Sequence, residues 1–134
     1  MCGIVGIYLK TKKFENKLGK MLSGMLNNME SRGPDSAGFA IYKNTDKKEY
    51  KYSLCIKNLD FTKFKKDISK KIRNLKLNQY SDHVIIKTTE IPKKFIKFIS
   101  KEFPGVYIVG YGHSIEIFKQ VGNPKDVVLS LIHI

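Results

Sequence analysis

Apolar and polar positions along this chain predict a series of short strands and three helices. Residues 3–9 are apolar at nearly every position, which is typical of a central strand covered on both faces. Between residues 18 and 29, leucines and methionines recur at helical spacing and form one continuous stripe. This helix should end at Arg32-Gly33-Pro34, because glycine favours the turn after a helix and proline cannot continue one.

Two strand pairs are expected further along the chain. Ala37–Lys43 and Glu49–Lys57 have strand composition and flank a polar stretch, so we expect them to form a hairpin. Val106–Tyr111 and Ile115–Gln120 flank Gly112-His113-Ser114 and should form a second hairpin.

Two more helices and one more strand complete the pattern. Asp60 can cap a helix over residues 60–76 with apolar residues inward and lysines outward, and Pro92 opens a helix through about Lys101. His83–Thr88 is a short apolar strand. Antiparallel strands with helices packed against them predict an α+β fold.

Composition is that of an ordinary globular domain. The chain has 134 residues, of which 42% are hydrophobic and 11% aromatic, enough for one domain with a core. No apolar run approaches the roughly 18–20 residues that span a membrane, so we expect a soluble, cytoplasmic protein without a membrane partner.

The net charge of +13 raises the question of nucleic-acid binding. Of the 25 basic residues only Arg32 and Arg73 are arginines, although arginine is the preferred fork for phosphates and bases. The lysines are spread over the whole chain. We therefore expect a solvated lysine-coated surface and no nucleic-acid partner.

The two cysteines, Cys2 and Cys55, lie in neither a disulfide framework nor a metal-binding spacing, so no metal is expected. Cys2 stands directly behind Met1, which is normally removed before a small residue. Cys2 would then carry both a thiol, with an ordinary pKa of about 8.5, and a free α-amine, with an ordinary pKa of about 8. Such an amine can accept the proton of its own thiol, and the thiolate is the nucleophile. A cysteine without any role remains the alternative on position alone.

Two motifs, CGIVGI at residues 2–7 and RGPDSAG at residues 32–38, resemble the start of a class II glutamine amidotransferase domain. Members of this family are N-terminal-nucleophile hydrolases with a four-layer αββα sandwich. YGHSIEIFK at residues 111–119 and VGNP at residues 121–124 resemble the stand-alone amidotransferase subunit of archaeal-type glutamate synthase. The resemblance covers residues 2–128, as the N-terminal part of such a domain.

The resemblance implies a role for each motif residue. Cys2 would be the catalytic nucleophile, with Arg32, Asp35 and Gly3 supporting its main chain. Without the resemblance, Arg32 and Asp35 could simply be a helix-end cation and a turn-forming acid. His83 and His113 are not expected to be catalytic, and Cys55 should be a core residue.

Residues that the family uses later in its domain have no match here. Members carry a Gly-His-Thr-Arg type strand that grips the glutamine carboxylate and an Asn-Gly pair that forms the oxyanion hole. Residues 129–134, LSLIHI, resemble the translated end of a transposon adaptor, so we predict a non-native tail; a genuine apolar strand is the alternative. The chain as it stands should be inactive.

The resemblance implies a glutaminase that takes glutamine as its substrate, needs no cofactor and passes ammonia to a synthase partner, most closely glutamate synthase. A non-catalytic subunit-binding module of the same fold is the alternative. A basic nucleic-acid binder ranks last.

Overall fold

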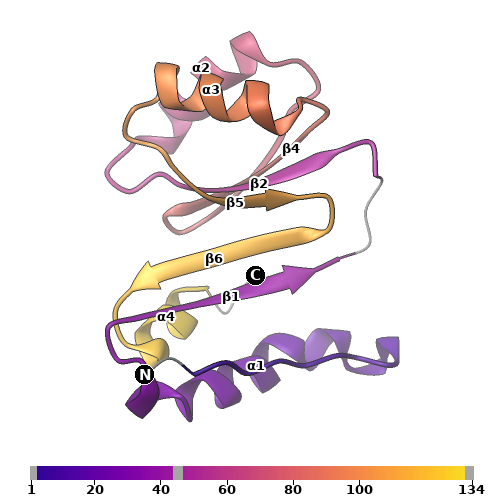
Figure 1. Cartoon of the computed structure of the whole chain (residues 1–134), viewed down its shortest axis with the longest axis vertical. Helices are drawn as coiled ribbons and strands as arrows, with labels where there is room; N and C mark the ends of the chain where they lie inside the picture. The colour runs from indigo at the N-terminus through magenta and orange to yellow at the C-terminus, as the bar shows by residue number, and fades with distance from the viewer. Residues whose placement is uncertain (1–2, 44–46, 132–134) are drawn as a thin grey trace. The chain divides into compact units, whose positions relative to one another are not determined.

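The computed structural model describes residues 3–43 and 47–131, which form an α+β fold with two antiparallel sheets (Figure 1). One sheet has four strands in the order β3-β4-β2-β5, and the other pairs β1 with β6. Two compact units are present, one continuous from Ala40 to Phe118 and one made of the residues on either side. In chain order the elements, with η for a 3-10 helix, are η1 (Lys12–Lys17), α1 (Leu18–Asn27), η2 (Glu30–Arg32), β1 (Ser36–Tyr42), β2 (Tyr50–Cys55), α2 (Phe61–Lys71), β3 (Lys76–Tyr80), β4 (His83–Thr88), α3 (Pro92–Glu102), β5 (Tyr107–Gly112), β6 (Ile115–Val121) and α4 (Pro124–Leu131).

The predicted α+β class is confirmed, together with most of the predicted elements. The first three helices and five of the predicted strands lie where the pattern put them, within a few residues. The predicted helix over residues 60–76 ends at Lys71, and β3 begins only five residues later, so this strand was missed. Helix α4 was not predicted: the sequence indicates a turn at Gly122-Asn123-Pro124 and no helix after it. Whether residues 129–134 are native stays a prediction.

Both predicted hairpins are wrong. β2 pairs with β4 and β5 instead of with β1, and β6 pairs with β1 instead of with β5. The true hairpin is β3–β4, closed between Tyr80 and His83 by a two-residue turn in which Ser81 has a φ of 51°. Strand composition identifies which residues are extended, but it does not identify which strand supplies the hydrogen-bond partners.

The predicted strand at residues 3–9 is also wrong. These residues are not assigned to any strand, and only alternate side chains, Val5, Ile7 and Leu9, are half-buried. Ile4 is 94% exposed and Tyr8 is 87% exposed, so the segment is covered on one side only. An apolar run becomes a strand only when another strand accepts its backbone hydrogen bonds, and no described segment pairs with this one.

The main core of the 40–118 unit lies between one face of the four-stranded sheet and helices α2 and α3 (Figure 1). Both helices place one apolar stripe against this face, and β2 is buried along nearly its whole length. The centre of this core consists of Tyr52, Leu54, Val84, Ile86, Phe64, Ile68, Phe95 and Ile99.

The opposite face of the same sheet is covered by the part of β6 that belongs to this unit. Phe118 of β6 is fully buried and contacts the rings of Tyr80 and His83. β6 runs very close to β5: a Cβ added to Gly110 would lie 2.5 Å from Ile117, and one added to Gly112 would lie 2.8 Å from Ile115. Glycine at these two positions therefore allows β6 to leave the sheet and cross over it.

In the other unit, α1 packs against α4, and Val127 and Val128 of α4 are buried. The leucine and methionine stripe of α1 is only half-buried in places, and Met21 is 44% exposed. Among the described residues, no helix is both long enough and apolar enough to span a bilayer.

Asp60 caps α2 as predicted. Its Oδ1 atom accepts hydrogen bonds from the backbone N–H groups of Thr62 at 2.7 Å and Lys63 at 3.2 Å. These two donors have no partner within the helix, so the cap replaces the water that would otherwise satisfy them.

Asp60→Ala should lower the free energy of unfolding by about 1 kcal/mol, because it removes the acceptor for the first turn of α2. Urea denaturation followed by circular dichroism measures this change. Asp67→Ala is the matched control: Asp67 lies in the same helix and pairs only with exposed Lys70, so its loss should change stability by less than about 0.5 kcal/mol. Equal effects of the two variants would contradict the capping role.

Candidate functional site

The predicted nucleophile, Cys2, lies outside the described residues, so its surroundings are read from Gly3 onward. A Cβ placed on Gly3 would lie 2.8 Å from the Met29 sulfur and 3.4 Å from Cβ of Arg32. The backbone that follows Cys2 therefore lies directly against the residues that end the first helical segment. The structure brings together two of the predicted supporting residues, Gly3 and Arg32.

The turn that carries Arg32 and Asp35 is held by backbone hydrogen bonds. The N–H of Arg32 donates to the carbonyl of Met29 at 2.9 Å, and that of Gly33 donates to Glu30 at 3.3 Å. After the turn, the carbonyl of Asp35 accepts a hydrogen bond from Gly122 N–H at 2.9 Å. The side chains of Arg32 and Asp35 are exposed, and α1 has already ended at Asn27.

Gly122 and Asn123 bring the second motif region to this turn. Gly122 has a φ of +130°, which side-chain-bearing residues rarely adopt. The Asn123 side-chain amide donates to the carboxylate of Glu30, and its carbonyl oxygen accepts from the Lys125 N–H at 2.9 Å. RGPD and GNP, widely separated in the sequence, are thus neighbours in one unit. Glu30 was not predicted, because its role depends on this long-range contact.

The remaining titratable candidates do not join this cluster. His83 is buried beneath Phe118, and the ring of His113 lies on Tyr50 with Nδ1 2.8 Å from the carbonyl oxygen of Glu49. Cys55 is half-buried at the end of β2. Within the described part of the chain, no three His, Cys, Asp or Glu side chains are grouped as metal ligands.

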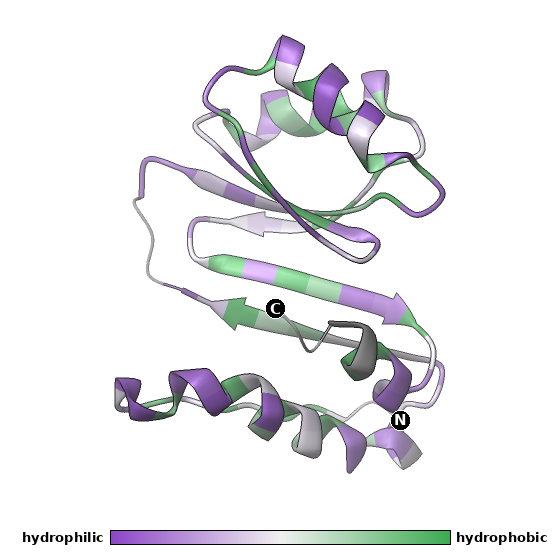
Figure 2. Ribbon diagram, turned by 180° about the vertical axis from the view of Figure 1, so that it is seen from behind, coloured by the Kyte–Doolittle hydropathy of each residue, from purple (hydrophilic) through white to green (hydrophobic). Residues whose placement is uncertain are grey.

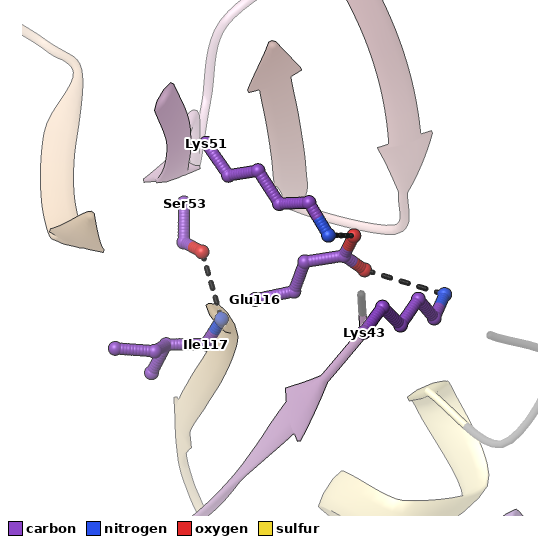
Figure 3. A network of polar contacts seen from close by, with 5 residues as sticks. All are labelled: Lys43, Lys51, Ser53, Glu116 and Ile117. Atoms are coloured by element: carbon purple, nitrogen blue, oxygen red, sulfur yellow. Dashed lines mark hydrogen bonds and ion pairs between the residues drawn. The ribbon is translucent and has the colours of Figure 1, made fainter. Parts of the chain in front are cut away.

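A second polar cluster lies in the 40–118 unit, between β2 and β6 (Figure 3). Lys51 and Glu116 are 1% and 3% exposed, and the Nζ of Lys51 lies 2.8 Å from Oε1 of Glu116. Lys43, whose side chain is half exposed, approaches the other carboxylate oxygen at 3.5 Å. Next to this pair, the Ile117 N–H donates to the Ser53 hydroxyl at 2.7 Å. The cluster attaches β6 to the face of β2.

Burial and the neighbouring charges shift the pKa of Glu116 in opposite directions. Burial by itself raises the pKa of this carboxyl, but the hydrogen bond from Lys51 and the charges of Lys43 and Lys51 outweigh it. The net result is a pKa below the ordinary value of 4.5, so the glutamate is ionised at neutral pH. In the main core, burial raises the pKa of the Tyr52 phenol, which donates to the carbonyl of Glu90 at 2.6 Å.

The expectation that the lysines form a solvated coat is wrong for Lys51. The sequence did contain a signal: Lys51 and Glu116 are single charges at inward-facing positions of two otherwise largely apolar strands. A charge at such a position is buried only when an opposite charge meets it there. The packing of β6 on the face of β2 could not be inferred once these strands had been assigned to separate hairpins.

Comparisons with known proteins agree with the motif resemblance. The chain is 37% identical over 131 residues to the glutamine amidotransferase-like protein GlxB of Rhizobium meliloti, covering 96% of this chain and 44% of that protein. It is 29% identical over 139 residues to a protein of Methanothermobacter thermautotrophicus named "Putative glutamine amidotransferase", covering 95% and 45% respectively. The chain therefore spans less than half the length of these curated relatives. No protein-family model matches it, and no solved structure matches it.

Lys51→Met should lower the free energy of unfolding by about 3 kcal/mol, because it leaves the buried Glu116 carboxylate with only the half-exposed Lys43 as its partner. Replacing both partners, as in Lys51→Met/Glu116→Leu, should restore most of that loss, since no buried charge then remains. Chemical denaturation measures both variants. Lys43→Met, which removes the half-exposed lysine, should cost less than about 1 kcal/mol. A double variant as unstable as the single one would contradict this account.

Acid should weaken the fold through Glu116. A carboxyl whose pKa is lowered on folding contributes stability above its unfolded pKa and loses it as pH falls through the folded value. The loss should therefore set in near the ordinary pKa of 4.5 and continue below it. Urea midpoints measured from neutral to acidic pH should fall more steeply for the native chain than for Lys51→Met/Glu116→Leu. Glu15→Gln, at an exposed site, should follow the native curve; identical curves for all three would overturn the assignment.

Proposed function

We propose that this chain is the N-terminal part of a class II glutamine amidotransferase that hydrolyses glutamine through Cys2. One structural observation carries the proposal: Gly3, next to the predicted nucleophile, packs against Arg32 at the start of the RGPD turn. The names of the two relatives support the amidotransferase role. The class, the chemistry and the partner described below belong to the proposal.

In the proposed reaction, removal of Met1 frees the α-amine of Cys2. This amine accepts the thiol proton, and the thiolate attacks the carboxamide carbon of glutamine. The proton then reaches the leaving nitrogen, ammonia departs, and a γ-glutamyl thioester remains on the sulfur. Water attacks the thioester, releasing glutamate and regenerating the thiol. No redox cofactor is required, since no step changes an oxidation state, and in this proposal the amine and thiol of Cys2 supply the base and the nucleophile.

The RGPD turn would position the nucleophile. Arg32 has a planar, permanently charged fork that can hold backbone carbonyls near the start of the chain. Asp35 lies three residues away in a turn fixed by Gly33 and by the Gly122 N–H, which suits a fixed partner for that fork. Gly3 has no side chain, which leaves room for Met29 and Arg32 beside the reacting residue.

The ammonia would pass to a synthase, and the YGHSIEIFK and VGNP stretches favour glutamate synthase as that partner. Groups that bind the glutamine carboxylate and stabilise the oxyanion are also required; removing one oxyanion donor alone costs about 10²–10³ in rate. Activity should therefore be assayed in the polypeptide that the intact gene encodes.

Cys2→Ser in that polypeptide should abolish glutamine hydrolysis while leaving the fold intact, because the serine hydroxyl is a far weaker nucleophile than the thiolate. Glutamate release measures turnover, and circular dichroism measures folding. Cys55→Ser is the matched control: it removes the other cysteine, which lies far along the chain at the end of β2, and should keep full activity.

An electrophilic glutamine analogue, such as a γ-diazoketone, gives an independent readout. It should alkylate Cys2 in the native protein and in Cys55→Ser, and peptide mass spectrometry identifies the modified residue. The mass of the intact N-terminus shows whether Met1 has been removed. Unchanged turnover in Cys2→Ser would sink the Cys2 mechanism, whereas a retained Met1 with no turnover would favour the non-catalytic binding module.

A further inference from the structure

Helices α2 and α3 concentrate positive charge on one surface. Both pack their apolar stripes against the same sheet, so their polar sides face solvent. Figure 2 shows hydrophilic segments in purple alternating with hydrophobic segments in green along these helices. These two helices contain nine lysines and two acidic residues, a net charge of +7 out of the chain's +13. We call the nine exposed lysines the lysine face; they are Lys63, Lys65, Lys66, Lys70, Lys71, Lys93, Lys94, Lys97 and Lys101.

The acidic residues on these helices offset little of this charge. Asp67 is matched with Lys70, and Glu102 with Lys71, so each neutralises one lysine. Lysines of one sign gathered on adjacent helices repel one another, and the potential they create attracts acidic partners from a distance. Solvation alone would be served equally well by mixed charges.

An open hollow of about 160 Å³ lies between the two helices within this face. Its lining combines an apolar floor with charged walls: Lys71, Ile72, Glu90, Lys94, Phe95 and Phe98. The floor is held by ring contacts. The centroids of the stacked Phe95 and Tyr52 rings are 3.9 Å apart, and those of the edge-on Phe98 and Phe103 rings are 5.9 Å apart. A preformed apolar hollow of this size suits one aliphatic or aromatic side chain.

The walls decide what can enter. Glu90 would repel a carboxylate inside the hollow, whereas Lys94 attracts a carboxylate at its rim. Lys71 can exchange its pair with Glu102 for such a carboxylate. The fitting ligand therefore has an apolar centre with acidic groups on its flanks. Nucleic acid fits less well, because its charge lies on a continuous backbone and the face contains lysines in place of arginine forks.

We propose that the lysine face is a docking surface for an acidic segment of a partner protein, with one large apolar side chain seated in the hollow between α2 and α3. This interaction is independent of the reaction at Cys2. It adds a recognition surface within the 40–118 unit that would recruit a partner through charge and hold it through one apolar anchor.

Selection from a random peptide library displayed on phage tests the proposal on the purified chain without assuming a sequence. Enriched peptides should be acidic and share one large apolar residue. The best of them, labelled with fluorescein, should bind by fluorescence anisotropy and weaken as salt is raised toward about 150 mM. Replacing its apolar residue by alanine should reduce affinity by about tenfold or more.

Charge reversal at the hollow supplies the matched pair of variants. Lys71→Glu/Lys94→Glu should reduce peptide affinity by about tenfold or more. The control, Lys57→Glu/Lys125→Glu, makes the same change in net charge at exposed sites outside α2 and α3. It should change the affinity by less than about threefold. Circular dichroism checks that both variants fold, and the alanine-substituted peptide tests the hollow without altering the protein.

Four outcomes would overturn the proposal. The first is a set of selected peptides without an acidic bias. The second is an equal loss of binding in the two double variants, which would make the attraction non-specific. A single-stranded RNA oligonucleotide that displaces the peptide and binds more tightly at about 150 mM salt would make the surface a nucleic-acid face instead. Failure to enrich any peptide would show that the hollow does not serve as a docking site.

Discussion

The burial of Lys51 in the middle of a sheet sets a condition that the 40–118 unit has to meet. An ammonium group removed from water requires an opposite charge at close range, and Glu116 supplies it from β6. This contact attaches β6 to the face of the four-stranded sheet. Gly110 and Gly112 leave the space for the crossing, and the Ser53 hydroxyl satisfies the Ile117 N–H that the crossing turns toward the sheet. The ion pair, the two glycines and the Ser53 hydroxyl together hold β6 against this face of the sheet.

Most elements of this fold could be predicted from the sequence, whereas the pairing of its strands could not. Periodicity located α1, α2 and α3, and the Asp60 cap and Pro92 at the start of α3 followed from local chemistry alone. The two predicted hairpins failed because each assumed that strands adjacent in sequence must pair. The strands that pair with β2 are β4 and β5, and β6 pairs with β1; these partners lie far apart in the sequence, and local patterns do not encode them.

At the candidate site, in contrast, the sequence motifs identified segments that do lie together in the structure. The RGPD and GNP motifs were identified from residue order, and they do lie side by side, joined by Asp35 with Gly122 and by Glu30 with Asn123. Glu30 was missed because a glutamate at the end of an amphipathic helix has no distinguishing local pattern. The apolar residues 3–9 were assigned to a strand on composition, although only one side of that segment is covered. Motifs identified the site's loops, whereas the packing around them depended on the tertiary structure.

The division into a continuous unit and a split unit has a consequence for how the chain folds. Residues 40–118 emerge from the ribosome as one uninterrupted stretch, and the strand pairs of the four-stranded sheet can all close within it. The contact of Glu30 with Asn123 spans 93 residues and has to wait until synthesis has passed both. Long loop closures are slow because their entropy is lost before the contact forms. The segment carrying the proposed nucleophile should therefore be synthesised first and ordered last.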